Sequence, residues 1–105
     1  MVYGIIKTIL FDEDFDKLEK VNKQRVEKIL NQLAYKDGNV GKPLRVPFFK
    51  EKKFNGNRLY FLVYEEFKKI LIIRIGKKKL QQQTINQTLN DLEKYKEFVI
   101  TQLEK

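Results

Sequence analysis

The spacing of hydrophobic residues divides the first third of the chain into a strand and a helical region. Val2–Leu10 (VYGIIKTIL) is an almost unbroken apolar and β-branched run, which predicts a strand. The acidic run Phe11–Asp16 (FDEDFD) follows it and offers caps for a helix. Apolar residues then recur three or four positions apart in two stripes, which predict a helical hairpin or one broken helix. The stripes are Phe11, Phe15, Leu18 and Val21, and then Val26, Ile29, Leu30 and Leu33.

Turn residues mark the change from helical to β pattern. Asp37-Gly38-Asn39 and Gly41-Lys42-Pro43 predict the end of the helical region and a loop. Arg45–Phe54 then predicts a strand, with Pro47 near its start or at a sheet edge.

The next two strands are predicted by a hairpin signal and by apolar runs. Asn55-Gly56 is the pair that a tight hairpin turn prefers, and it leads into the aromatic run Arg58–Tyr64 (RLYFLVY). Ile70–Ile75 (ILIIRI) is apolar except for one arginine, as expected for a central strand, and Gly76 ends it.

The last part of the chain returns to helical spacing, with Thr84 as a candidate cap. The apolar positions are Ile85, Leu89, Leu92, Tyr95, Val99 and Leu103. The predicted order is therefore β-α-α-β-β-β-α in a single domain spanning residues 1–105. We expect an α+β fold, with a twisted and mostly antiparallel sheet, an N-terminal helical hairpin and a C-terminal helix.

Composition excludes several kinds of chemistry. The chain has no cysteine and no histidine, which removes disulfides, thiolate catalysis, imidazole catalysis and the usual zinc sites. We therefore expect no metal and no cofactor. No apolar run approaches the roughly 20 residues of a membrane span, and no signal peptide is evident at the N-terminus. A cytoplasmic protein without a membrane partner is expected.

The positive charge is concentrated in the middle of the chain. The net charge is +8, and residues 36–81 hold thirteen Lys/Arg against four Asp/Glu, a local net charge of +9. The flanking segments are neutral or slightly acidic. Such a basic segment favours a polyanionic partner, and the alternative is a solvated lysine-rich surface.

The same middle segment resembles the RelE/ParE toxin superfamily. The matching features are the GKPL loop of Gly41–Leu44, the basic strand around Lys50–Lys53, the Gly56-Asn57-Arg58 hairpin start and the lysines of Lys77–Lys79. The segment from Lys77 onward also resembles the HigB-like branch. The resemblance implies a toxin of a type II toxin–antitoxin system, with an antitoxin that folds on it as a helix or an added strand. It further implies an endoribonuclease that cuts messenger RNA on the ribosome.

This implied chemistry is attack of an RNA 2′-hydroxyl on the adjacent phosphorus. It needs a proton acceptor, a proton donor and positive charge near the phosphate, which crowded Lys and Arg can supply without metal. By resemblance, Arg58 holds the phosphate. Lys50 and Lys52, on one face of their strand, are candidates for the base, and Lys78 takes the place of a family arginine proposed as the acid. The expected RNA-binding residues are Arg45, Lys53, Arg74, Lys77 and Lys79.

Each assignment has a simpler structural alternative. Arg58 can form a surface ion pair, Lys50–Lys53 can be a charged edge strand, and Lys78 can be a loop cation without a defined role. Arg74 lies within an apolar strand, so an ion pair with Glu65 or Glu66 is the alternative to RNA binding.

One departure from the family pattern opens other functions. RelE has a tyrosine that stacks on an RNA base, whereas the matching place here, near Thr84, has no aromatic residue. Tyr60 or Tyr64 could substitute. The alternatives are a non-catalytic member of the fold that binds nucleic acid, or a ParE-like inhibitor of DNA gyrase.

Overall fold

The computed structural model describes residues 2–105 and contains one five-stranded mixed sheet. The strand order is β1-β5-β4-β3-β2, with β1 parallel to β5 and every other neighbouring pair antiparallel. The strands are β1 (Gly4–Lys7), β2 (Lys42–Leu44), β3 (Val46–Phe54), β4 (Asn57–Tyr64) and β5 (Lys69–Lys77). The predicted α+β class and its mostly antiparallel sheet are confirmed.

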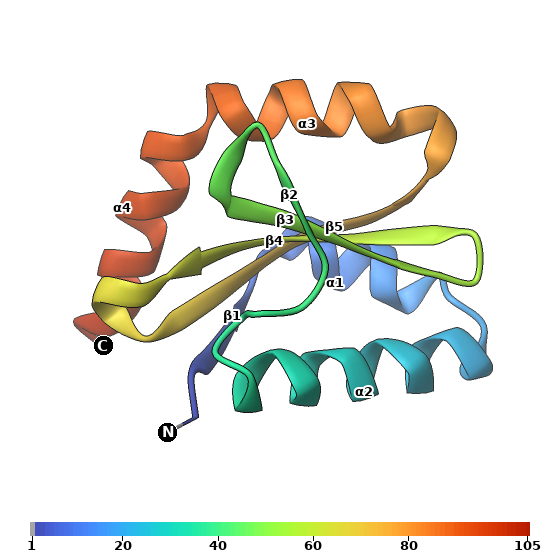
Figure 1. Ribbon diagram of the computed structural model, residues 1–105, viewed down its shortest axis with the longest axis horizontal. Coiled ribbons are helices and arrows are strands. Elements are labelled where there is room, and N and C mark those ends of the chain that lie inside the picture. The colour runs from blue at the N-terminus through green and yellow to red at the C-terminus, as the bar shows by residue number, and fades with distance from the viewer. Residues whose placement is uncertain (1) are drawn as a thin grey trace.

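Helices cover both faces of this sheet (Figure 1). The helices α1 (Ile9–Asp16) and α2 (Lys20–Tyr35) pack on one face, and α3 (Gln81–Asn90) and α4 (Leu92–Leu103) pack on the other. Alternate side chains of the central strands enter two separate cores, one under each helix pair. This double cover explains why all eight residues of β4 are buried and why its sequence is apolar at nearly every position.

The hairpin between β3 and β4 forms where the Asn-Gly pair predicts it. Asn55 and Gly56 both have positive φ, 45° and 78°, which is the backbone of a type I′ turn. The register then runs without a bulge from Phe54↔Asn57 to Phe49↔Leu62.

The predicted loop at residues 41–43 is partly a strand. Lys42–Leu44 forms the edge strand β2, and Pro43 is tolerated because only one side of an edge strand must donate hydrogen bonds. The next strand begins at Val46 rather than Arg45, because Arg45 has a φ of 63° and lies in the turn between β2 and β3.

The C-terminal helix begins earlier than predicted and is divided in two. Helix α3 starts at Gln81, so the prediction that Thr84 caps the helix is wrong. Thr84 lies in the first turns of α3, where its small side chain is buried. Helix α3 runs across the sheet (Figure 1), and at Asp91 the chain changes direction into α4, which still packs on the sheet through Val99. None of the helices between residues 2 and 105 combines the length and the apolar character that crossing a bilayer requires.

Candidate nucleic-acid interface

Arg58 lies almost buried near the start of β4, on the face covered by α3. Its side chain is 10% exposed, and its Nε lies 3.6 Å from Oε2 of Glu51 on β3. Glu51 is 3% exposed, and the same Oε2 accepts a hydrogen bond of 2.9 Å from Nε2 of Gln81, the first residue of α3. The three side chains form a buried polar cluster that joins β3, β4 and α3.

The Arg58 guanidinium is not fully satisfied by this cluster. Its Nε is sealed from solvent yet makes no hydrogen bond to any described residue, because the carboxylate is at ion-pair rather than hydrogen-bond distance. A buried charge with free donor capacity is well suited to hold a second anion. Glu51 was not predicted from sequence. The sequence did contain one indication of its position. In the strand segment Lys50–Lys53, alternation places Glu51 on the same face as Lys53.

The lysines of β3 separate onto the two faces of the sheet. Phe49 belongs to the core under α3 and Phe54 to the core under α2. Alternation therefore places Lys53 on the face of Arg58, its direct partner in the register, and Lys50 and Lys52 together on the other face. The predicted sharing of a face by Lys50 and Lys52 agrees with this register, but the structure does not bring either of them to Arg58.

Lys50 has a separate environment. Its Nζ donates a hydrogen bond of 3.2 Å to the Gly38 carbonyl, and its partner in the register is Phe61, well along the strand from Arg58. Arg45 is also distant from Arg58 along β3, because it lies in the turn at the opposite end of that strand from the hairpin.

A run of exposed lysines lies beside Arg58 at the end of β5. Gly76 is the register partner of Arg58 and Lys77 that of Asn57, and the 3-10 turn that follows contains Lys78 and Lys79. All three lysines are exposed. We call Lys53, Arg58, Lys77, Lys78 and Lys79 the hairpin-end cluster. Five cations so placed, with Glu51 the one buried carboxylate among residues 2–105, give this end of the sheet a positive surface.

Arg74 belongs to a different contact. Its Nε and Nη2 donate to Oδ2 and Oδ1 of Asp14, each at 3.1 Å, and the Ile75 N–H donates to Oδ2 at 3.0 Å. The hydrogen bonds with Asp14 raise the pKa of Arg74. Arg74 does form an ion pair, as the structural alternative predicted, but its partner is Asp14 and not Glu65 or Glu66. Strand β1 ends opposite Ile72, so the rest of β5 has no strand beside it on that edge and is bordered by α1. Asp14 of α1 accepts the hydrogen bonds that this edge of β5 donates.

Neither Tyr60 nor Tyr64 can replace the missing stacking residue in this conformation. Tyr60 is fully buried and Tyr64 is 4% exposed. Burial, assisted by Glu51, raises the pKa of Tyr60 to about 12, and burial raises the pKa of Tyr64 to about 12 as well. No acidic cluster within residues 2–105 has the composition to hold a metal ion.

Comparisons with known proteins give a fold match. No family model and no curated protein matches the sequence. The RelBE2 toxin–antitoxin complex of Mycobacterium tuberculosis contains a chain 23% identical, with a TM-score of 0.63, covering 74% of this chain and 100% of that chain.

Two further solved structures agree. A mutant of the E. coli toxin RelE in the free state is 18% identical with a TM-score of 0.68, covering 83% of this chain and 93% of that chain. The archaeal RelE–RelB complex of Pyrococcus horikoshii is 17% identical with a TM-score of 0.63, covering 73% and 96%. At these identities the likeness concerns the path of the backbone.

Proposed function

This chain has the RelE toxin fold, and on that premise we propose that it is the toxin of a type II toxin–antitoxin system and cuts ribosome-bound messenger RNA without metal. The observation that carries the proposal is the buried, incompletely satisfied Arg58 guanidinium within a cluster of exposed lysines. The partners we propose are messenger RNA on the ribosome and a cognate antitoxin, because the structures that share this fold include toxins bound to antitoxins.

The reaction proposed is an internal transfer of the phosphodiester. The 2′-oxygen forms a bond to phosphorus while the bond from phosphorus to the 5′-oxygen breaks, leaving a 2′,3′-cyclic phosphate and a 5′-hydroxyl. Arg58 holds the phosphate oxygens and offsets their growing charge, and Lys53, on the same face, binds the neighbouring backbone. Lys78 gives a proton to the leaving 5′-oxygen.

Glu51 is our candidate for the proton acceptor. It lies on the same face as Arg58, whereas Lys50 and Lys52 lie on the opposite face. A phosphate that binds the Arg58 guanidinium would replace Glu51 as its counter-ion. The Glu51 carboxylate would then be free to accept the 2′-proton. Binding must then open the contact between Gln81 and Glu51, because that contact closes the cluster at present.

One observation favours a second function, that of a non-catalytic nucleic-acid-binding protein. Tyr60 and Tyr64 are buried, and the place near Thr84 that by resemblance corresponds to RelE's stacking tyrosine has no aromatic residue. Without a stacking ring, the nucleotide loses roughly 1–3 kcal/mol of binding free energy that would otherwise help to orient it. Such a protein would still bind RNA through the hairpin-end cluster.

Primer extension on messenger RNA from a translating extract tests the proposal. New ends at in-frame positions with the wild-type chain, and none without ribosomes, are expected. Lys78→Ala, an exposed site, and Arg58→Ala should abolish them, and Arg25→Ala, an exposed arginine on α2, should not. Circular dichroism checks that Arg58→Ala remains folded. If the wild type produces no new ends, catalysis is rejected. Assays of binding to bare RNA and of DNA gyrase inhibition then distinguish a nucleic-acid-binding protein from a gyrase inhibitor.

A further inference from the structure

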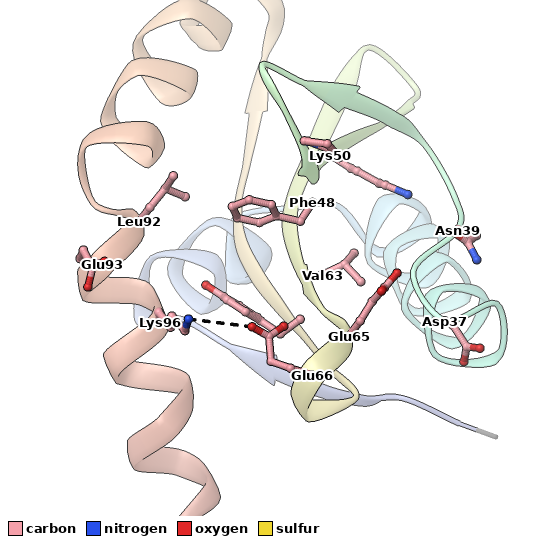
Figure 2. A pocket seen from close by; sticks show the side chains of 12 residues that line it. Asp37, Asn39, Phe48, Lys50, Val63, Glu65, Glu66, Leu92, Glu93 and Lys96 are labelled. Atoms are coloured by element: carbon pink, nitrogen blue, oxygen red, sulfur yellow. Dashed lines mark ion pairs between the residues drawn. The ribbon is translucent and has the colours of Figure 1, made fainter.

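A groove of about 530 Å³ lies at the end of the β3–β4 pair opposite the hairpin-end cluster. Figure 2 shows its two walls, which are α4 with Leu92 and Lys96 on one side and the α2–β2 loop with Asp37 on the other. Phe48 and Val63 lie between these walls and give the groove an apolar floor. The volume and the apolar floor suit a small organic molecule, for which sites of roughly 300–1,000 Å³ are usual.

The groove is acidic on a basic protein. Four carboxylates line it against the two ammonium groups of Lys50 and Lys96, so its formal charge is −2 while that of the chain is +8. The carboxylates are those of Asp37, Glu65, Glu66 and Glu93. This charge favours a cationic occupant and disfavours RNA.

The carboxylates are spread along the groove and do not converge on one point. In the turn after β4, Glu66 pairs with Lys96 of α4 at 3.9 Å, whereas Glu65 points toward the loop wall (Figure 2). Partial burial raises the pKa of Tyr3, and the charges of Asp37 and Glu65 raise it further, so these two carboxylates lie near the same phenol. No group of three acidic residues within residues 2–105 is arranged to hold a metal ion. Two separate acidic ends fit a ligand whose positive charges are themselves separated.

A buried polar atom without a partner lies at each of these ends. Tyr64 lines the groove and is 4% exposed, and its hydroxyl makes no hydrogen bond to any described residue. Burial raises the pKa of Tyr64 and the charge of Glu66 adds to the effect, so this hydroxyl is at the α4 end. At the loop end, Oδ1 of Asp37 is buried and likewise unpartnered among the described residues. Buried polar groups are normally satisfied, so both atoms indicate where a ligand completes the hydrogen bonding.

The ion pair at the α4 end is easily opened. The side chains of Lys96 and Glu66 are 49% and 54% exposed, and their charged atoms are no closer than 3.9 Å. An exposed pair of this kind contributes little to stability. The ammonium group of a ligand can therefore take the place of Lys96 beside Glu66 and reach the Tyr64 hydroxyl.

We propose that this groove binds a linear aliphatic polyamine of the spermidine type. One terminal ammonium group pairs with Glu66 and donates a hydrogen bond to the Tyr64 hydroxyl oxygen. The other terminal group donates to Asp37 beside Glu65, and the methylene chain between them contacts Phe48. Aliphatic amines are protonated at neutral pH, as the lysine side chain is. The inference goes beyond the proposed function, since it depends on neither RNA nor catalysis.

NMR titration of the isotope-labelled full chain with spermidine, in the absence of nucleic acid, tests the proposal. Shifts of the amide signals of residues 63–66 and 92–96 are expected, saturating at millimolar spermidine or below. Spermidine acetylated at both terminal amines keeps the backbone of the ligand and loses its terminal charges, so it should leave these signals unchanged. Absence of saturable shifts in these two segments, or equal shifts with the acetylated compound, would overturn the proposal.

Substitutions separate the groove from diffuse charge attraction. Glu65→Gln with Glu66→Gln should weaken spermidine binding by about threefold or more, while Glu97→Gln with Glu104→Gln, exposed carboxylates outside the groove, should not. Equal weakening by the two pairs would reduce the effect to general attraction and contradict a built site.

Two further comparisons test the hydroxyl and the kind of ligand. Tyr64→Phe removes only the hydroxyl and should weaken spermidine binding by about twofold or more. An unchanged affinity would remove Tyr64 from the site and overturn the proposed binding mode. The dipeptide amide Lys-Lys carries nearly the same charge as spermidine and should bind more weakly. Tighter binding of the dipeptide would assign the groove to a protein segment and overturn the proposal. None of these titrations contains RNA, so each result is independent of whether the chain cuts RNA.

Discussion

Gln81 and Glu51 connect the first residue of α3 to the middle of β3, through a hydrogen bond of 2.9 Å from Nε2 to Oε2. The same oxygen lies 3.6 Å from Nε of Arg58, so one carboxylate fixes both the arginine and the start of the helix that covers it. The position of α3 and the environment of Arg58 are therefore coupled.

Gln81→Ala should lower the free energy of unfolding by roughly 1–3 kcal/mol, because it removes a hydrogen bond to a buried charge. Urea denaturation provides the measurement. Gln83→Ala, two residues along the same helix and exposed, is the matched control and should change stability by less than about 0.5 kcal/mol. Equal effects of the two substitutions would show that the hydrogen bond to Glu51 contributes nothing.

Glu51→Gln should cost more, roughly 3–5 kcal/mol, since it leaves the Arg58 charge buried without its counter-ion. Combining Glu51→Leu with Arg58→Met should restore most of that stability, because two apolar side chains replace the pair. A double variant as unstable as the single one would contradict this account of the cluster.

Gly56→Ala should destabilise the protein by about 1–2 kcal/mol, because Gly56 has a φ of 78° in the hairpin turn. Gly76→Ala is the control. A Cβ at either position would meet no atom within 4 Å, so only the backbone strain at Gly56 distinguishes the two. Thermal unfolding of both variants gives the comparison.

Stability should fall as pH rises from about 10 to about 12, since Tyr60 and Tyr64 have pKa values raised from 10.0 to about 12 by burial. The unfolded chain loses these protons near pH 10 and the folded chain retains them, so alkali favours unfolding across that interval and not below it. Tyr60→Phe with Tyr64→Phe should flatten this part of the urea-stability curve. Tyr35→Phe, at a residue 75% exposed, should leave it unchanged.

Replacing Lys77, Lys78 and Lys79 together by Ala should weaken RNA binding and reduce its dependence on salt. For a single strand, the slope of log K against log salt falls by about 0.7 for each phosphate that the protein no longer neutralises. Fluorescence anisotropy at several salt concentrations measures the slope. Replacing the exposed Lys17, Lys20 and Lys28, which lie after α1 and on α2, removes the same charge and should leave the slope nearly intact.

The sequence was most informative where local chemistry determines structure. The Asn55-Gly56 turn, the mostly apolar β4 and the helical stripe of α2 follow from turn preference and hydrophobic spacing. The short strand β2 and the break at Asp91 did not, because both depend on packing against residues distant in the chain.

The site was harder to predict for the same reason. The Asn-Gly signal placed Arg58 just past a hairpin, and the family resemblance implied roles for Arg58 and for Lys77–Lys79. They gave no indication that Glu51 would lie beside Arg58, or that Asp14, sixty residues earlier, would bind Arg74. Such pairs depend on the register of the strands and on where the helices pack. Neither can be read from the composition or the spacing of residues in the sequence.

The parallel pairing of β1 with β5 has a consequence for synthesis of the chain. Thr8, directly after β1, donates to the carbonyl of Ile73, a hydrogen bond that spans 65 residues. During translation, β1 therefore has no strand to pair with until β5 has left the ribosome. The hairpin-end cluster also takes its lysines from the end of β5, so a nascent chain cannot assemble it before about three quarters of the protein has been made.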